Sequence, residues 1–592
     1  MHLPKIVSVV FSLFMALYSP LSVRAQSELS TARIDHLMRA EWKKRGIIPA
    51  PPVDDAHYLR RIYLDITGTL PSPTEVRAFL ADKTPYKRAA AVEKLLNSPR
   101  YSLYWVNYWD DVLLGRQVRQ AVVDRSAFRQ WLSKQITKNA SYDRFVYELL
   151  TASGVNSLGG SYLASATNSM QMEAMEPSGA TKASGAGVNG AVNWSLKYQQ
   201  TPADYSGAVS RLFLGVQIQC AQCHDHKSEK WKQEDFRRFT ACFMRTRVQL
   251  VDKKQDVKGI RRVDLQDNAA PLRIAPRMQE RLKQNGRMEY LAALPATLDG
   301  TDLTQVANPR EAIARWITAP ENPWFAKAIV NRLWAHFLGR GFVNPIDDFR
   351  DSNPAVMPEL LSLLAEDFKL HGNDIKTLVR LICSTQVYQL SSQPAKVSDS
   401  TNALWERYRV KPLKPEVLLE LLVSATNMEP LLEQIAGERL PMLKASLQKQ
   451  FTFLFDVDEE AEQKDYEGTI PQALMLLNGN LLNSSVSPLP GTALAEILAL
   501  PNTDAQKVEA LYLRTLSRLP AKGESQRWVQ FLNAPRELSL TSTSTEGGQK
   551  RRGGDPFSRL GTRLDSSTTP KQQAFEDLFW VLLNSSEFIF NH

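Results

Sequence analysis

The chain has 592 residues, of which 43% are hydrophobic, and it carries a formal net charge of +9. This length provides for two or three packed domains, and four cysteines are too few for a scaffold built on disulfides. Basic side chains stand beside acidic ones, as in "RAAAVEKLL" and "QEDFRRF", and form no basic stripe with interleaved aromatic residues. We therefore expect a solvated surface and no nucleic-acid partner.

The N-terminus has the layout of a secretory signal peptide. Lys5 precedes an apolar run over residues 6–18, and residues 23–25, "VRA", form a small-x-small cleavage signal. The run is shorter than the roughly 20 residues that cross a membrane, which disfavours an uncleaved anchor. We predict removal of residues 1–25, export to the periplasm or cell surface, and no transmembrane segment in the mature chain.

Helical periodicity dominates the rest of the chain. Apolar residues recur at three- and four-residue steps, and several such segments begin at a Ser, Thr or Asp cap and end at Gly or Pro. The clearest segments are 30–46, 72–82, 125–139, 310–320, 357–372 and 374–390. The pattern predicts an all-α fold with long loops.

Three stretches interrupt this pattern. Residues 153–200 are rich in Gly, Ser and Ala, which predicts a long flexible surface loop. Residues 245–275 alternate in a strand-like way and predict a small β-hairpin. Residues 541–567, with "TSTSTEGG" and "KRRGGD", predict a flexible insertion before the last helix.

The chain contains an internal repeat. Residues 62–80, "IYLDITGTLPSPTEVRAFL", align without gaps on residues 511–529, "LYLRTLSRLPAKGESQRWV". Similar endings follow each copy, "KLLNSPRY" at 94–101 and "VLLNSSEF" at 581–588. Each unit reads as a helix, a Leu-Pro turn and a second helix. A duplicated helical hairpin is the simplest explanation, and convergent helix-turn chemistry is the alternative.

Two of the four cysteines and two of the eight histidines fall within residues 220–226, "CAQCHDH". In a c-type haem site, the two thiols of Cys-x-x-Cys bond to haem vinyl groups and the next histidine ligates the iron. This spacing assigns Cys220 and Cys223 to haem attachment and His224 to the proximal position. Predicted export favours haem c, because its covalent attachment is completed outside the cytoplasm.

Zinc and a disulfide are the alternatives to haem. A mixed zinc site would draw its ligands from Cys220, Cys223, His224, His226 and Cys242. An ordinary four-cysteine zinc ribbon would need a cysteine at position 245, which is Arg245. The residues around Cys242 have the periodicity of an amphipathic helix, so we expect Cys242 in the core. A bond between Cys220 and Cys223 is the third option in an oxidising compartment.

The distal iron ligand is not fixed by the motif. His226 is only two residues beyond His224, too close to cross to the other haem face, so we expect it beside the first ligand shell or as an alternative ligand. Met244 and His336 are the candidates for the distal position. His336, in "VNRLWAHFLGRGF", reads equally as a hydrogen-bonded helix histidine.

The segment "NPIDDFRDSNP" offers another polar constellation. Asp347, Asp348 and Asp351 lie near Arg350. Paired carboxylates serve glycoside chemistry or hold a hard cation. Asp and Asn in a turn before a helix more often cap the backbone, so we expect a structural role.

The blocks "YLRRIYLDITGTLPSPTEVRAFLAD" and "SRLFLGVQIQCAQCHDHKSEKWKQEDFRRFTACF" resemble the planctomycete-type cytochrome-c-like domain of large exported proteins. "NPREAIARWITAPENPWFAKAIVNRLWAHFLGRGF" resembles the C-terminal domain of unknown function that accompanies it. The pair Lys227-Ser228 replaces the Pro-Phe that usually follows the motif in the family. The resemblance implies an exported c-type-haem-like protein.

We therefore expect electron transfer or a haem-dependent redox step, with an unknown redox partner or a carbohydrate-related substrate, because family members commonly occur beside polysaccharide-handling proteins. A non-redox scaffold with a structural zinc site is the alternative. The predicted domains are a cytochrome-c-like domain at 26–244, a connecting segment at 245–300 and a helical domain at 301–592.

Overall fold

The structure is a computed structural model. It describes residues 21–116, 118, 120–158, 187–199, 201–225, 227, 229–252, 259–268, 283, 288–394, 402–440, 443–444, 446–448, 451, 485–535 and 569–592, with the backbone alone for 21–30 and 435. Residues 1–20 of the predicted signal peptide and the insertion at 541–567 lie outside these residues. The first described helix begins at Leu21 and runs through the predicted cleavage position after Ala25.

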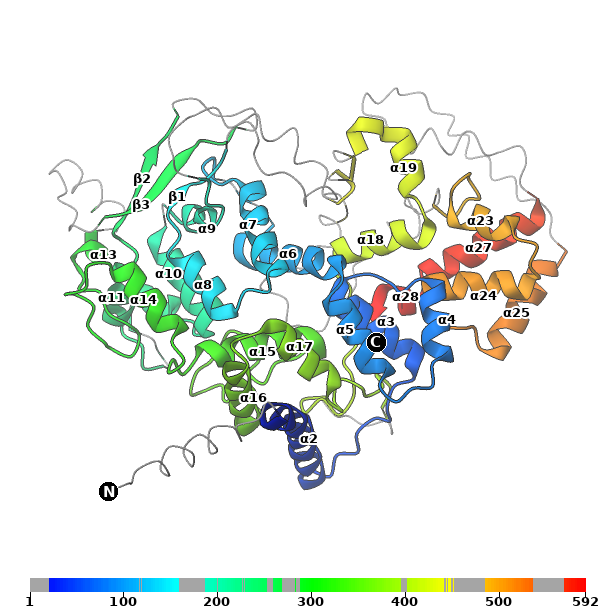
Figure 1. The fold of residues 1–592 in the computed structure, drawn as a ribbon, viewed down its shortest axis with the longest axis horizontal. Helices are drawn as coiled ribbons and strands as arrows, with labels where there is room; N and C mark the ends of the chain where they lie inside the picture. The colour runs from blue at the N-terminus through cyan, green and yellow to red at the C-terminus, as the bar shows by residue number, and fades with distance from the viewer. Residues whose placement is uncertain are drawn as a thin grey trace, which may run out of the picture.

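Helices make up most of the described chain, as the sequence predicted (Figure 1). The N-terminal half contains α2 (Leu21–Lys44), α3 (Asp55–Thr67), α4 (Pro73–Ala81), α5 (Lys87–Leu96), α6 (Pro99–Leu114), α7 (Arg125–Thr137), α8 (Tyr142–Leu150), α9 (Val192–Lys197), α10 (Pro202–Val209), the π-helix η1 (Ser210–Leu214), the 3-10 helix η2 (Gln219–Gln222), α11 (Gln233–Ala241) and α13 (Met288–Ala292). The C-terminal half contains α14 (Pro309–Thr318), α15 (Phe325–Leu338), α16 (Pro358–Leu370), α17 (Ile375–Ser384), α18 (Pro415–Thr426), α19 (Glu429–Ala436), the 3-10 helix η3 (Gly437–Arg439), α23 (Ala493–Ala499), α24 (Asp504–Thr515), α25 (Lys522–Asn533), α27 (Pro570–Leu583) and α28 (Ser586–Ile589). Among the described residues, no helix is both long and apolar enough to cross a membrane.

The predicted hairpin is confirmed. Strand β2 (Thr246–Leu250) pairs antiparallel with β3 (Val263–Asp267), and β1 (Gly154–Val155) joins the other edge of β3. A second, two-stranded sheet pairs β4 (Lys411–Pro412) with β5 (Phe590–Asn591). Both sheets are antiparallel and small, so they fasten helices together and do not form a layer of their own.

The described part of the stretch predicted as a loop at 153–200 is ordered at both ends. Strand β1 occupies its start, and α9 buries Trp194 and Leu196 near its end. Composition did not show this, because the apolar residues of α9 are diluted by the surrounding Gly, Ser and Ala. Residues 159–186, at the centre of the predicted loop, lie outside the described part.

Among the described residues, two hydrophobic cores organise the helices. The first is built from residues 34–408 together with Leu513, and it spans both sides of residue 301, where a domain boundary was predicted. The second is built from residues 418–588 together with Leu64. In Figure 1 the blue helices α3 and α4 lie beside the orange helix α24 and the red C-terminal segment, away from α7–α14, and α4 contacts α24 while α3 contacts β5. The two ends of the chain therefore fold together.

The internal repeat has matching structure in both copies. Helices α3 and α4 correspond to α24 and α25, and the endings place Ser98 and Ser585 as N-caps of α6 and α28. Leu64 of the first copy packs into the second core, and the aligned Leu513 packs into the first. Helices α4 and α24 are in contact. Each copy of the repeat therefore contributes the same aligned leucine to the core that contains most of the other copy's surroundings, Leu64 to the second core and Leu513 to the first.

A buried carboxylate on α3 gathers distant segments. Asp65, 4% exposed, accepts hydrogen bonds at Oδ2 from the hydroxyls of Tyr388 (2.9 Å) and Tyr408 (3.0 Å). Its Oδ1 accepts from Lys411 Nζ at 2.6 Å and from Asn591 Nδ2 at 2.8 Å. Buried charges persist where partners and hydrogen bonds compensate for lost hydration, and Asp65 has both.

Two neighbouring arginines extend these connections. Arg60 donates to the carbonyls of Thr515 (2.8 Å) and Phe588 (2.9 Å), which belong to the C-terminal helices. Arg61 donates to the carbonyl of Leu390 at 3.0 Å. The "RRIYLD" segment of α3 therefore acts as an internal polar junction, although a helix in this position would ordinarily present only apolar residues.

We predict that Asp65→Asn destabilises the fold strongly. The substitution leaves Lys411 without its buried counter-charge, and breaking such a pair from one side costs about 3–5 kcal/mol of unfolding free energy. Urea denaturation followed by circular dichroism measures the change. The control is Glu420→Gln, which removes an exposed pair with Arg100 and should change the unfolding free energy by no more than about 1 kcal/mol. Equal effects of the two variants would contradict the proposed importance of Asp65.

Candidate functional site

The Cys-x-x-Cys-His motif lies on the surface between two buried anchors. Ile218 and Trp231 are 1% and 7% exposed, whereas Cys220, Cys223 and His224 between them are exposed. Cys220 belongs to η2, and Cys223 and His224 follow it directly. Burial of the flanking residues fixes the segment while both thiols stay accessible.

The motif segment packs against helices α10 and α11. A Cβ on Gly207 of α10 would lie only 2.4 Å from Gln219 Cγ, so glycine allows η2 to approach α10 closely. The backbone N–H of Gln233, at the start of α11, donates to Asp225 Oδ1 at 2.8 Å. The side chain of Gln233 donates to the Gln222 carbonyl at 3.1 Å. The motif is therefore held at several points by folded helices.

The loop between α15 and α16 packs against the segment that leads into the motif. The N–H of Phe349 donates to the carbonyl of Gly215 at 2.8 Å. Gly215 has φ +69°, and a Cβ there would lie 2.5 Å from the Phe349 ring. Both observations require glycine at this position. The loop and the motif are thus positioned by the same close contact.

Charged side chains of this loop complete the surroundings of the motif. Asp347 pairs with Arg211 at 3.1 Å and accepts from Gln217 Nε2 at 3.3 Å. On the other side, Ser352 Oγ donates to Glu229 Oε1 at 2.6 Å. Asp348 pairs with Arg350 at 3.1 Å, and Asp351 is exposed. Of the three carboxylates that we considered for acid-base chemistry, Asp347 therefore connects the loop to the segment before the motif, whereas Asp348 pairs within the loop.

His224 is held by one nitrogen of its ring. Its Nδ1 lies 2.7 Å from the carbonyl oxygen of Asp225. A carbonyl accepts but cannot donate, so this bond places the proton on Nδ1 and leaves the Nε2 lone pair for a ligand. Such a backbone bond from the second nitrogen is the usual way in which a metal-ligating histidine is oriented.

The other predicted ligands lie elsewhere or outside the described residues. Met244 is buried in the first core, at 6% exposure. Cys242 is fully buried, with Sγ 3.6 Å from the Ala296 carbonyl, and burial raises the pKa of its thiol to about 12. Within the described chain, no three of Cys220, Cys223, His224 and Cys242 bring ligand atoms within 4.8 Å of one another. His226 lies outside the described residues.

His336 lies in an aromatic cluster on α15. Its Nε2 donates to the carbonyl of Asp65 at 3.2 Å, and its ring centroid lies 5.3 Å from that of Trp105 and 5.2 Å from that of Tyr108. These contacts are with α3 and α6, whereas η2 packs on α10 and α11. Ligation of a haem iron by Nε2 of His336 would require its bond to the Asp65 carbonyl to break.

Comparison with protein families agrees with the resemblance found in the sequence. A family model described as PSCyt2, a protein of unknown function (DUF1549), matches residues 33–248. A second model, described as PSD1, a protein of unknown function (DUF1553), matches residues 309–532. The chain therefore contains both of these domains, PSCyt2 before PSD1. No curated protein and no solved structure gave a match.

These matches place the motif and its surroundings in different domains. The motif belongs to the PSCyt2 domain, and the loop at 345–353 belongs to the PSD1 domain. The contacts of Phe349, Asp347 and Ser352 with the segment at 211–229 are therefore contacts between the domains. The candidate site is built by both.

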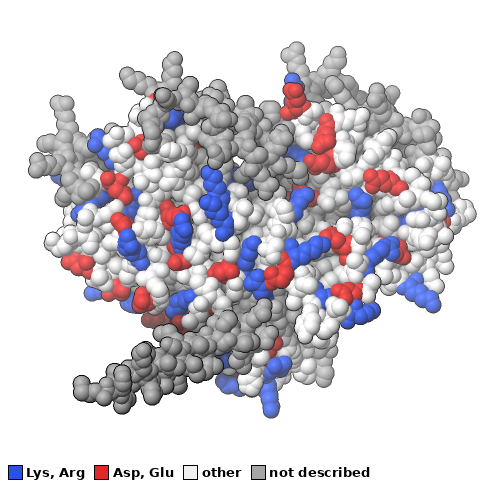
Figure 2. All heavy atoms as spheres, in the orientation of Figure 1, with Lys and Arg blue, Asp and Glu red and all other residues white. Residues whose placement is uncertain are grey.

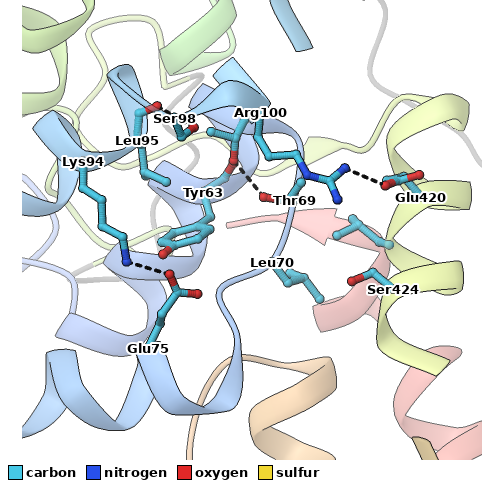
Figure 3. Close-up of a pocket in the computed structure, with 12 residues that line it drawn as sticks. Tyr63, Thr69, Leu70, Glu75, Lys94, Leu95, Ser98, Arg100, Glu420 and Ser424 are labelled. Atoms are coloured by element: carbon cyan, nitrogen blue, oxygen red, sulfur yellow. Dashed lines mark hydrogen bonds and ion pairs between the residues drawn. The ribbon is translucent and has the colours of Figure 1, made fainter. Parts of the chain in front are cut away.

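A pocket of about 250 Å³ lies apart from the motif, where α3–α6 meet α18 (Figure 3). Its charged groups are paired: Lys94 Nζ lies 2.6 Å from Glu75 Oε1, and Arg100 Nη1 lies 3.0 Å from Glu420 Oε1. Burial acts to raise the pKa of Glu75, but hydrogen bonds from Lys94 and Ser72 outweigh it and lower the pKa to about 2. Glu75 is therefore ionised at neutral pH and cannot serve there as a general acid.

The structure also brings together three residues that the sequence did not single out. His57, Glu587 and His592 place ligand atoms within 4.8 Å of one another. His57 is in the PSCyt2 match, whereas Glu587 and His592 follow the PSD1 match. His57 is more than 500 residues from Glu587 and His592, so no local sequence spacing encodes this cluster. A prediction would have needed the contact between α3 and the C-terminal segment.

We predict a pH-dependent contribution of His336 to stability. Burial, together with the charge of Lys411, lowers the pKa of His336 from 6.5 to about 4. Between these values the unfolded chain binds a proton that the folded chain does not, so stability falls as the pH drops from about 6.5 to about 4. The loss amounts to up to about 3 kcal/mol of unfolding free energy.

Urea denaturation of the wild type and of His336→Gln between pH 4 and pH 7.5 measures this effect. The stability of the wild type should fall more steeply on acidification than that of the variant, because only the wild type carries this histidine. Above about pH 6.5 the difference between the two proteins should be constant. Parallel curves over the whole range would contradict the assignment.

Proposed function

We propose that this protein binds haem c through Cys220, Cys223 and His224 and acts in electron transfer or a haem-dependent redox step outside the cytoplasm. The hydrogen bond from His224 Nδ1 to the Asp225 carbonyl, 2.7 Å, carries the proposal. It presents Nε2 as a ligand from an exposed position beside two free thiols. The donor set therefore fits a c-type haem.

The four cysteines divide into two chemical classes. Cys220 and Cys223 are exposed and free, whereas Cys242 and Cys383 are buried. Burial raises the pKa of both buried thiols, which keeps them neutral and inert. Attachment adds each exposed S–H across a vinyl double bond: sulfur bonds to one carbon, hydrogen to the other, and no oxidant is consumed. Only the motif cysteines are accessible for this reaction.

The charged residues around the motif give it a recognition surface. Arg211 and Glu229 flank the exposed segment and contact the loop at 345–353, and Arg350 belongs to that loop. Bound haem would supply one-electron chemistry, and the protein would contribute its orientation and these charges. A redox partner with complementary charges could dock here. The link to polysaccharide metabolism rests on the family resemblance alone.

The structural zinc alternative receives less support from the geometry. A tetrahedral site needs four ligand atoms around one ion. Cys242 faces the core, and within the described chain the remaining motif ligands do not gather on one point. Thioether attachment places the sulfurs along a porphyrin edge, so it does not require them to meet.

We predict that haem loading depends on the exposed cysteines alone. Protein matured in a host with c-type haem assembly should show a Soret band, and its haem should remain on the chain in SDS. Cys220→Ala/Cys223→Ala should abolish the covalent haem stain, because no thioether can form. His224→Ala should keep some covalent haem but change its visible spectrum, because the proximal ligand is lost.

The matched control is Cys242→Ala, which removes a buried cysteine outside the motif. It should retain covalent haem at the wild-type level per folded chain. A wild-type chain without haem but with one equivalent of zinc that disappears in Cys220→Ala would refute the haem proposal and favour the scaffold alternative. Equal haem loading of Cys220→Ala/Cys223→Ala and the wild type would refute the assignment of the thiols.

A further inference from the structure

The cluster of His57, Glu587 and His592 joins the two ends of the chain. His57 lies in the first turn of α3, Glu587 in α28, and His592 directly after β5. His57 Nε2 lies 3.8 Å from Glu587 Oε1, and the two imidazole centroids are 5.4 Å apart. All three residues are half-buried. Two imidazoles and a carboxylate therefore converge on one small volume.

Asp54 orients His57 toward this volume. As N-cap of α3, Asp54 accepts the backbone N–H of His57 at Oδ1, 3.0 Å, and the ring Nδ1 at Oδ2, 2.7 Å. The carboxylate is ionised and acts as the acceptor, so Nδ1 carries the proton and Nε2 carries the lone pair. This carboxylate-histidine arrangement is how proteins fix the tautomer of a metal ligand.

The backbone around the cluster is fixed by contacts unrelated to it. Arg60 holds the Phe588 carbonyl beside Glu587, and Asp65 binds Asn591 next to His592. The N–H of Leu413 donates to the carbonyl of Ile589 at 3.3 Å, which secures β5 against β4. The ligand positions are therefore preorganised by the fold, as a specific metal site requires.

Glu587 also pairs with an arginine. Arg518 Nε lies 2.6 Å from Oε1 and Nη2 lies 2.9 Å from Oε2. A carboxylate has about four lone-pair positions on its two oxygens, so each oxygen can accept one of these bonds and still face a cation. Carboxylates that ligate metals are commonly hydrogen-bonded in this way. Arg518 therefore keeps Glu587 ionised and fixed in place.

We propose that His57, Glu587 and His592 bind a divalent transition-metal ion, with Zn²⁺ as the preferred cation. Two imidazoles with one carboxylate form a donor set of zinc sites that keep a fourth position open. Imidazole nitrogens disfavour Mg²⁺ and Ca²⁺, which select oxygen ligands. The ion would fasten the start of α3 to the C-terminal strand. This site is separate from the Cys-His motif and does not depend on haem.

The test uses the full chain with Cys220, Cys223 and His224 replaced by alanine, so that the motif cannot bind zinc. After equilibration with Zn²⁺ and removal of free metal, elemental analysis should find about one Zn²⁺ per chain. Added Zn²⁺ should raise the thermal midpoint, because a ligand that binds only the folded state stabilises it. Co²⁺ should give d-d absorption without a thiolate charge-transfer band.

His57→Ala should abolish bound Zn²⁺ and the shift in thermal midpoint. The matched control is His371→Ala: His371 also pairs with a carboxylate, Asp367 at 3.4 Å, but belongs to no three-ligand group within the described residues. This control should retain both effects. Absence of bound zinc in the parent chain, or equal zinc in His57→Ala, would overturn the proposal.

Asp54→Asn provides a second, conservative variant. Asparagine is as good an N-cap as aspartate, so α3 should keep its start. It cannot accept at both positions that Asp54 serves, so the orientation of His57 is lost and Zn²⁺ affinity should fall about 10- to 100-fold. Unchanged affinity together with an unchanged thermal midpoint in EDTA would show that Asp54 merely caps the helix and would count against the site.

Discussion

The architecture depends on the buried carboxylate of Asp65. Its four partners come from positions 388, 408, 411 and 591, so a single side chain near the N-terminus fixes segments more than 300 residues away. Removing two charges from water is unfavourable unless they are paired and fully hydrogen-bonded, and here the pairing with Lys411 exists only in the assembled fold. The network therefore specifies one arrangement of the chain ends and penalises partly assembled ones.

The same constraint positions both proposed ligand sites, through different elements. On one side, Asn591 holds β5 beside α3, which brings His592 to His57. On the other, Lys411 donates to the carbonyls of His336 and Phe337 at the end of α15, the helix from which the loop at 345–353 departs. That loop contacts Gly215 and so supports the segment before the motif. Both sites are therefore secured by the junction between the cores.

The sequence predicted what depends on local pattern. Periodicity gave the helices, alternation gave the β2–β3 hairpin, and the Cys-His spacing identified the segment whose two cysteines are exposed. The sequence could not predict that Asp65 binds four distant side chains, because no regular spacing relates residue 65 to residues 388, 408, 411 and 591. The apolar residues of α9 did not stand out, because the surrounding sequence is rich in Gly, Ser and Ala. The cluster at His57 arises only when residues 57 and 592 come together in the fold. Long-range contacts, which no local signal encodes, account for these omissions.

The packing of the motif on α10 and α11 bears on whether the chain would fold before or after the proposed haem attachment. Cys220 and Cys223 remain exposed although η2 is fastened to α10 and α11 and the PSD1 loop packs against residues 211–217. The folded chain therefore presents the thiols, and the proposed haem attachment would not require the surrounding helices to open. The ring of His224 is likewise exposed, and it is oriented by its hydrogen bond to the Asp225 carbonyl and not by a surrounding pocket. A haem bound at the proposed site would therefore lie at the surface, within reach of a docked redox partner.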